Sequence, residues 1–301
     1  MYKHKITVFT PTYNRGSLLE KLFASLQKQT FTDFEWLIVD DGSTDNTEEL
    51  LKRWQKMQLH FPLHYHRTPN GGKMRAVNYG LDLAQGELFF VVDSDDYLTE
   101  TALERIDYWA NTLTPQQKPF FAGVSGDKIY ESGQSVGTTC AGKSFDCTAL
   151  ERDKLGVHGD KAEAFFTDVF RKYKFPEFTG EKFITESVVY YRMAKDGYKV
   201  RFFNEGIYVC DYLPDGLTKN ALSLHMHNPK GSMLAAKERL TYPELTKQLK
   251  IATIYYCYKG VTQAGYSRSE ICTRLNITNF QLSTALFIGN LHEIKKKLLK
   301  K

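Results

Sequence analysis

Short apolar runs alternate with amphipathic segments through the first third of the chain. Four of the runs are rich in β-branched and aromatic residues and predict strands: 6–10, 34–39, 63–67 and 88–92. Between them, apolar residues recur on one helical face in three segments: 17–26, 48–58 and 75–84. Strands and helices that alternate in this way predict an α/β fold with a mostly parallel sheet.

The second half of the chain follows a different pattern. Three segments have the composition of short strands, and the last two alternate like a strand pair: 120–125, 197–203 and 207–211. Residues 126–142 are rich in Gly, Ser and Thr and predict loops or a hairpin. A helix is predicted from residue 181 to about residue 196, and the chain from residue 232 onward has the pattern of helices.

Composition narrows the class of protein. A chain of 301 residues with 42% hydrophobic residues can bury a sizeable core. Its five cysteines form no CxxC pair, which argues against zinc and a disulfide scaffold and fits a reducing cytoplasm. We expect no signal peptide, and no apolar run is long enough to span a bilayer. The net charge of +5 is mild, and we expect no nucleic-acid partner.

Polar clusters stand at the end of each predicted strand in the first third: Thr10–Thr12, Asp40–Ser43, Asn70–Lys73 and Asp93–Asp96. In open α/β sheets, ligands bind at this carboxyl edge. No GxGxxG sequence follows the first strand and no GxxxxGK[ST] sequence occurs, so the usual dinucleotide fingerprint and the P-loop are both absent. Four converging polar clusters are nevertheless more than connecting loops require.

The cluster Asp93–Asp96 carries the most chemistry. Three carboxylates that follow an apolar run together repel one another, and a hard cation would neutralise them. Oxygen ligands of this kind suit Mg²⁺ or Mn²⁺. The alternative is an acidic N-cap for a helix that starts near Thr99. The other polar clusters favour the metal.

Taken together, these motifs resemble the family 2 glycosyltransferases, which have the GT-A fold. The resemblance rests on four stretches in the family's order and spacing: 8–15, 39–45, 70–78 and 84–96. It is dense in the first half, thins between about residues 110 and 175, and returns at 180–211. It implies a GT-A nucleotide-diphospho-sugar transferase fold, with a mostly parallel central sheet flanked by helices and a C-terminal helical extension.

The resemblance implies domains at 1–215 and 216–301. The first would be the catalytic domain, with a nucleotide-binding half at 1–100 and an acceptor-binding half at 101–215. The second would be the helical extension.

By matching position, the resemblance assigns roles to individual residues. The nucleotide base and ribose would be surrounded by four residues: Thr10, Pro11, Tyr13 and Arg15. Asp41 would accept a hydrogen bond from the base imide, which favours uracil, although Asp40–Ser43 also fits a turn with a helix cap. Gly72, beside Gly71, would let the backbone approach the ligand.

The remaining implied roles concern the diphosphate, the metal and the sugar. Lys73 would face the diphosphate, unless it is an exposed lysine on a turn. Asp93 would touch the ribose, and Ser94 is counted with the nucleotide-sugar-binding residues. Asp95, helped by Asp96, would hold the Mn²⁺ or Mg²⁺ that bridges the diphosphate.

An inverting transferase also needs a general base for the acceptor hydroxyl. The family usually places a Glu-Asp pair at the start of a helix in its second half. The matching pair here is Thr185-Glu186, a departure that makes Glu186 the candidate base. The alternative is a first-turn glutamate stabilised by the helix dipole. His225 and His227 fit a late metal ligand or surface histidines, and the spacing leaves this open.

The resemblance therefore implies a metal-dependent, inverting glycosyltransferase of the hexosyltransferase type. It would use a UDP-sugar donor and a glycan or lipid-linked acceptor in the synthesis of capsule, exopolysaccharide or another cell-surface polysaccharide. Two rivals are a nucleotidyltransferase, which would usually carry a Gly-rich basic loop after the first strand, and a non-catalytic nucleotide-sugar-binding subunit.

The C-terminal segment suggests a membrane contact. Its apolar residues fall roughly on one helical face and precede a lysine cluster: Leu282, Ala285, Leu286, Ile288, Leu291 and Ile294. A basic amphipathic helix can lie on an anionic bilayer. The alternative is a helix packed on the catalytic domain with a solvated charged end. We expect a cytoplasmic protein, at the inner face of the cell membrane if the helix binds there.

Overall fold

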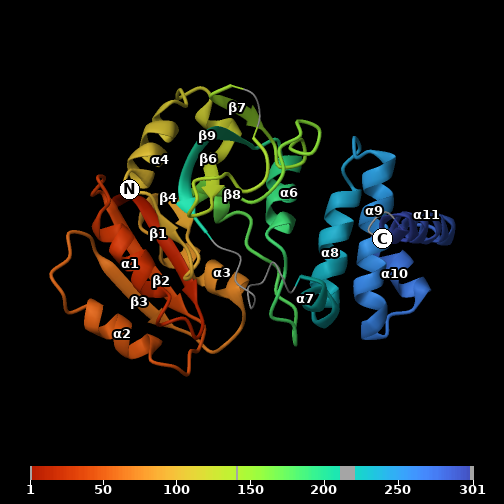
Figure 1. The fold of residues 1–301 in the computed structure, drawn as a ribbon, viewed down its shortest axis with the longest axis horizontal. Helices are drawn as coiled ribbons and strands as arrows, with labels where there is room; N and C mark the ends of the chain where they lie inside the picture. The colour runs from red at the N-terminus through yellow and green to blue at the C-terminus, as the bar shows by residue number, and fades with distance from the viewer. Residues whose placement is uncertain (1, 140–141, 211–220, 299–301) are drawn as a thin grey trace. The chain divides into compact units, whose positions relative to one another are not determined.

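The computed structural model describes residues 2–139, 142–210 and 221–298 (Figure 1). The chain divides into two compact units. Unit 1 comprises Met1–Lys174 and Met193–Asp211, and unit 2 comprises Phe175–Arg192 and Tyr212–Lys301. The expected boundary at residues 215–216 lies outside the described residues, so the division into 1–215 and 216–301 stays a prediction.

Unit 1 is built on one mixed sheet with the strand order β3-β2-β1-β4-β8-β6-β9-β5, and β7 pairs with β9. The four strands of the first third are parallel neighbours, as predicted, and β6 and β9 also pair in parallel. The strands are β1 (His4–Thr12), β2 (Phe34–Asp40), β3 (Leu63–Arg67), β4 (Gly86–Val91), β5 (Tyr97–Leu98), β6 (Phe121–Ile129), β7 (Ser144–Cys147), β8 (Lys161–Phe166) and β9 (Lys199–Val209).

The helices of unit 1 follow the strands in the predicted alternation, and Figure 1 shows α1, α3 and α4 beside the sheet. They are α1 (Leu19–Gln27), α2 (Thr47–Trp54), α3 (Lys73–Leu83), α4 (Ala102–Asn111) and α5 (Thr167–Phe170), with a 3₁₀ turn η1 (Lys118–Phe120). An aromatic layer packs α1 and α2 onto β2: the Trp36 ring centre lies 6.0 Å from that of Phe23 and 5.8 Å from that of Trp54.

Helix α3 lies especially close to β1. A Cβ atom at Gly80 would stand 2.1 Å from the Phe9 ring, so only glycine allows this approach. The Phe9 ring in turn stacks on Phe89 of β4, with ring centres 4.9 Å apart. The first residue of α3, Lys73, is thereby fixed at the carboxyl edge of the sheet.

The register brings the strand ends together. Thr12 pairs with Asp40, which pairs with Arg67, and Val92 donates its N–H to the Phe9 carbonyl at 2.8 Å. Strands β4 and β6 run in the same direction because both are antiparallel to β8. The end of β6 therefore lies at the same edge as the ends of β1, β2 and β4.

Two predicted elements differ from the structure. The strand pair expected at 197–203 and 207–211 is one long strand, β9, because both halves pair with β6 across a register shift. The helix expected from residue 181 begins only at Ser187, as α6 (Ser187–Lys195). The preceding residues are held by unit 2: Asn228 accepts hydrogen bonds from the N–H groups of Lys182 and Phe183 at 2.8 and 3.0 Å.

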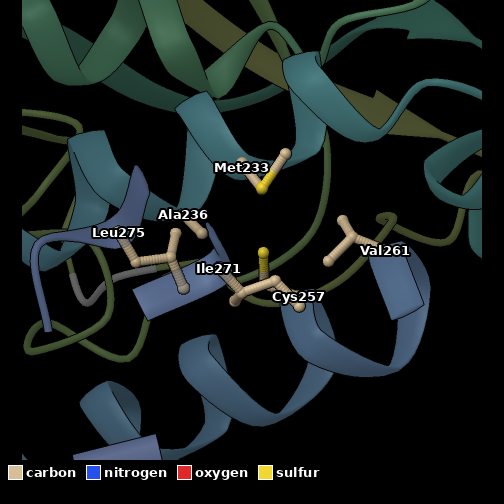
Figure 2. Close-up of a cluster of buried hydrophobic side chains, with 6 residues drawn as sticks. All are labelled: Met233, Ala236, Cys257, Val261, Ile271 and Leu275. Atoms are coloured by element: carbon tan, nitrogen blue, oxygen red, sulfur yellow. The ribbon is translucent and has the colours of Figure 1, made fainter. Parts of the chain in front are cut away.

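The described residues of unit 2 form further helices: α7 (Ala221–His227), α8 (Pro229–Leu240), α9 (Lys247–Val261), α10 (Arg268–Leu275) and α11 (Asn279–Leu298), with a 3₁₀ turn η2 (Thr262–Ala264). Figure 2 shows a core cluster in which pairs of side chains from α8, α9 and α10 meet: Met233, Ala236, Cys257, Val261, Ile271 and Leu275. A second cluster joins α9, α10 and α11 through Ile254, Cys272, Leu282 and Ala285. Within the described residues, no helix is long and apolar enough to cross a membrane.

Candidate active site

The acidic turn, residues 93–96, connects β4 to β5 at the carboxyl edge of the sheet. The turn is closed by a hydrogen bond from the Asp96 N–H to the Asp93 carbonyl at 3.2 Å. Ser94 and Asp96 are buried, whereas Asp93 and Asp95 are half-buried. The sequence prediction that these residues end a strand is therefore correct, and no long helix begins at the turn itself.

Two lysines face the acidic turn. Lys73 Nζ lies 2.7 Å from Asp93 Oδ1. Burial opposes ionisation of Asp93, but the ammonium groups of Lys73 and then Lys128 outweigh it and lower the pKa of Asp93 below its ordinary value. Lys73 is thus an ion-pair partner at the first turn of α3 rather than a solvent-exposed lysine.

The other two carboxyl groups of the turn resist ionisation. Burial, followed by the charge of Asp93, raises the pKa of Asp96 to about 7. The same two causes raise the pKa of Asp95, although Arg15 and Lys73 partly oppose them. Burial and the charge of Asp93 produce both shifts, and a divalent cation at this turn would offset the second cause.

Asp41 holds the loop in front of α3. Its Oδ1 accepts the Gly71 N–H and its Oδ2 accepts the Gly72 N–H, both at 2.7 Å. Asn70 Nδ2 also donates to Asp41 Oδ2, at 3.1 Å. Gly72 has φ 97°, a conformation that disfavours any residue with a Cβ atom. The structure therefore gives Asp41 and Gly72 a shared structural task, which the sequence did not predict.

The predicted site residues at the end of β1 differ in how far they are buried. Thr10 is fully buried, and its Oγ1 accepts a hydrogen bond from the Trp36 indole at 3.0 Å, so its side chain belongs to the core. Pro11 is also buried, whereas Tyr13 is 47% exposed and Arg15 is half-buried. Among the described residues, the buried Thr12 hydroxyl has no hydrogen-bond partner.

The β1 and β2 loops are joined by Asn14, which has φ 52°. Its N–H donates to Ser43 Oγ at 2.8 Å, and its Oδ1 accepts the Thr44 N–H at 2.7 Å. Asn is among the few residues that adopt this left-handed conformation readily. The junction fixes the segment that carries Tyr13 and Arg15.

The candidate base belongs to unit 2. Glu186 is half-buried, and its carbonyl accepts the N–H groups of Val189 and Tyr190 at 3.0 and 3.2 Å, so it stands at the N-terminus of α6 as predicted. The neighbouring Glu181 is committed elsewhere: its two carboxylate oxygens accept the N–H groups of Lys230 and Gly231, each at 2.9 Å, which caps α8.

The two late histidines are each hydrogen-bonded within unit 2 through Nδ1. His225 Nδ1 lies 2.8 Å from Ser232 Oγ, and burial lowers the pKa of the His225 ring. His227 Nδ1 lies 2.8 Å from the Ser223 carbonyl. In the part of the chain that the structure describes, no group of three or more His, Cys, Asp or Glu side chains is arranged to hold a metal. Any metal would therefore need further ligands, such as a diphosphate.

The sequence analysis missed two residues at this site, Lys128 and Tyr208. They pair with each other at the ends of β6 and β9, and the Lys128 ammonium lies 4.1 Å from the centre of the Tyr208 ring. The Tyr208 hydroxyl donates to Asp96 Oδ2 at 2.7 Å. In the sequence, each of these residues is a polar residue at the end of an apolar strand. That pattern indicates a site residue only once β6 and β9 are known to run parallel to β4.

Known proteins resemble this chain in both sequence and fold. The sequence profile described as "Glycosyl transferase family 2" matches residues 7–113. Glycosyltransferase GlyG of Streptococcus pneumoniae serotype 4 is 30% identical over 220 residues, which span 68% of this chain and 69% of GlyG. The chain belongs to glycosyltransferase family 2. The matched region of this family 2 glycosyltransferase contains every predicted nucleotide and metal residue and leaves out Glu186.

Other known proteins share part of the sequence or the fold of this family 2 glycosyltransferase. The GalNAc(5)-diNAcBac-PP-undecaprenol β-1,3-glucosyltransferase of Campylobacter jejuni is 33% identical over 174 residues, but the chain spans only about half of that enzyme (52%). Among solved structures, S. aureus TarS in complex with UDP-GlcNAc has a TM-score of 0.66 at 20% identity, covering 94% of this chain and 79% of that one. This likeness confirms the predicted GT-A fold.

The contacts of Asp41 predict a structural cost on substitution. Asp41→Asn would place an N–H donor against one of the two glycine N–H groups. We expect the free energy of unfolding in urea to fall by about 1–3 kcal/mol, with faster amide exchange at Gly71 and Gly72. The exposed Asp33→Asn variant is the control. Unchanged exchange at both glycines would show that Asp41 does not hold the loop.

Proposed function

We propose that this family 2 glycosyltransferase transfers a sugar from a UDP-sugar, with inversion, to a hydroxyl of a glycan or lipid-linked acceptor in the synthesis of a cell-surface polysaccharide. The observation that carries the proposal is the acidic turn, 93–96, with Lys73 bound to Asp93 at the carboxyl edge of the sheet. A nucleotidyltransferase is disfavoured by the family, while a non-catalytic subunit remains a rival for experiment to exclude.

The acidic turn fits a divalent metal by its donor set. Asp95 and Asp96 provide carboxylate oxygens, the preferred ligands of Mn²⁺ and Mg²⁺. Burial, followed by the charge of Asp93, raises the pKa of both groups. When bound, the metal would neutralise charge on the leaving diphosphate. The structure of the mannosyltransferase PcManGT from Pyrobaculum calidifontis with GDP-Man and Mn²⁺ shares the fold at a TM-score of 0.56.

The donor is proposed to be a UDP-sugar carrying a hexose-type group. TarS binds UDP-GlcNAc, and the Campylobacter relative is a glucosyltransferase whose name includes a polyprenol-diphosphate glycan. Exposed Tyr13 and half-buried Arg15 would contact the base and ribose, with the buried Pro11 beneath them. Asp41, whose two oxygens accept the N–H groups of Gly71 and Gly72, would accept the uracil imide as a further hydrogen bond.

The chain's own residues account for the proposed reaction. Glu186 takes the proton of the acceptor hydroxyl as that oxygen forms a bond to the anomeric carbon. The bond from the anomeric carbon to the diphosphate oxygen breaks, and the electron pair leaves with UDP. Lys73 stabilises the negative charge of the leaving group. The N-terminus of α3, where Lys73 lies, favours the same negative charge through the helix dipole.

The metal and donor assignments predict a specific binding pattern. UDP with Mn²⁺ should stabilise the wild-type protein in a thermal-shift assay, by about 2.7 kcal/mol at a hundredfold excess over Kd. Asp95→Asn should lose the Mn²⁺-dependent part, because one of the proposed metal ligands becomes a neutral amide. EDTA should have the same effect on the wild type.

Other nucleotides and variants serve as controls for that pattern. GDP, CDP and ADP should stabilise less than UDP, and Asp107→Asn on α4 should respond like the wild type. Stabilisation by another nucleotide alone would reject the UDP assignment. Binding without donor hydrolysis or transfer would favour the non-catalytic subunit.

The general-base role makes a separate prediction for Glu186. Glu186→Gln keeps the size of the side chain but cannot take a proton, so kcat should fall by about 10²- to 10⁴-fold while the Kd for UDP–Mn²⁺ stays unchanged. Glu177→Gln, an exposed residue of the same unit, is the matched control. A Glu186→Gln enzyme with normal kcat would remove Glu186 from the mechanism.

We also propose that α11 lies on an anionic membrane surface. The single apolar face predicted from the sequence is in fact two opposite faces. Leu282 and Ala285 pack in the core of unit 2, whereas the other face is exposed: Phe280 80%, Phe287 67%, Leu291 52% and Ile294 55%. The lysines at 295–297 follow this exposed stripe, and their charge complements anionic lipid rather than a second copy of a basic chain.

Vesicle binding tests the α11 surface. The full chain should co-sediment with vesicles containing anionic phosphatidylserine, more weakly at high salt and not with pure phosphatidylcholine. A Phe287→Ser, Leu291→Ser variant should bind at least about tenfold more weakly, given ~1.5–3 kcal/mol for each buried apolar side chain. Phe120→Ser, another exposed aromatic, is the control. No vesicle binding, with a dimer that the double variant breaks, would identify a second copy as the partner.

A further inference from the structure

Tyr208 has a buried hydroxyl with two partners in the acidic turn. The residue is 1% exposed, and the edge of its ring packs against Phe90 of β4, with ring centres 6.2 Å apart. The hydroxyl accepts the Asp93 N–H at 2.9 Å and donates to Asp96 Oδ2 at 2.7 Å. One oxygen atom therefore holds both ends of the turn.

The sheet explains how this hydroxyl reaches the turn. Strand β5 follows the turn directly and pairs antiparallel with β9, so that Leu98 lies opposite Tyr208. Strand β4, which precedes the turn, is three places away from β9 in the sheet. The acidic turn must therefore cross β8, β6 and β9 to reach β5, and Tyr208 is the residue of β9 that binds it.

Lys128 contacts the ring of Tyr208, whose hydroxyl binds the acidic turn. It pairs with Tyr208 in the β6–β9 register, and its ammonium lies 4.1 Å from the ring centre, within the range of a cation–π contact. Its charge acts on both Asp93 and Asp96. The negative charge of the turn is thus balanced by Lys73 at Asp93 and by Lys128 over the Tyr208 ring.

We propose that Tyr208 is a positioning residue for the metal–diphosphate site, and that Lys128, seated on its ring, is the counter-charge that keeps the acidic turn assembled when no metal is bound. The proposal rests on the proposed function and adds two residues to it. Tyr208 would set the direction of the Asp96 carboxylate before the metal arrives, as outer-shell hydrogen bonds do for metal ligands.

The two residues should affect metal binding in opposite directions. The Tyr208 hydroxyl orders the turn, so its loss should weaken metal binding. Lys128 repels a cation and attracts a diphosphate, so its loss should strengthen binding of the metal alone and weaken binding of UDP alone. If either residue had a purely structural role, its loss would weaken binding of the metal alone, of UDP alone and of UDP with the metal.

The experiment is calorimetric titration of the full chain with Mn²⁺ alone, with UDP in EDTA, and with UDP at saturating Mn²⁺. Tyr208→Phe keeps the ring and removes both hydrogen bonds. We expect its Mn²⁺ affinity to fall by about 10- to 100-fold, with UDP binding recovered at high Mn²⁺. Tyr198→Phe is the matched control. Tyr198 lies just before β9 begins, and its hydroxyl contacts Lys172.

Lys128→Met supplies the second arm, since it removes the charge and keeps the length of the side chain. We expect tighter Mn²⁺ binding and weaker UDP binding in EDTA. Wild-type affinities in both variants would overturn the proposed roles of Tyr208 and Lys128 and leave the proposed function intact. A wild-type protein that binds neither Mn²⁺ nor UDP–Mn²⁺ would overturn both. Weaker binding of all three probes by Lys128→Met would overturn its role as a counter-charge.

Discussion

Mutual repulsion of three carboxyl groups within one turn is the constraint on which unit 1 depends. Asp93, Asp95 and Asp96 leave the sheet together, and only Asp93 has an ordinary ion-pair partner among the contacts described above, Lys73. Burial, followed by repulsion from Asp93, raises the pKa values of the other two. A fold that tolerates this arrangement without metal needs fixed positive charge and hydrogen-bond donors at the same edge.

The directions of the strands and helices bring these charges and donors to the carboxyl edge, although the residues are far apart in the sequence. Helix α3 starts at the edge because Gly80 lets it lie against Phe9, and Lys73 is its first residue. Strands β6 and β9 end at the same edge because β8 reverses the chain between β4 and β6. Asp41 then fixes the loop that leads into α3 with bonds to two glycine N–H groups. A substitution at Gly80 or Asp41 would therefore also disturb the position of Lys73.

Unit 2 is held by a different set of interactions. Glu181 caps α8, and Asn228 binds the backbone that precedes α6, so the segment carrying Glu186 is tied to the C-terminal helices. This arrangement explains why residues 175–192 belong to the same compact unit as those helices. The buried Glu181 carboxylate accepts the N–H groups at the N-terminus of α8 and so caps that helix.

The sequence by itself determined the element types of the first third, the polar clusters at the strand ends and the family, because these depend on local periodicity and on motifs with fixed spacing. Only the tertiary structure decided which groups meet there. Thr10 turned out to bind Trp36 in the core, and Tyr208 binds Asp96 from 112 residues away. The two faces of α11 were equally unreadable, since an apolar helical pattern does not say which side packs on α9. Such pairings follow from strand order and register, which are long-range properties that no local pattern encodes.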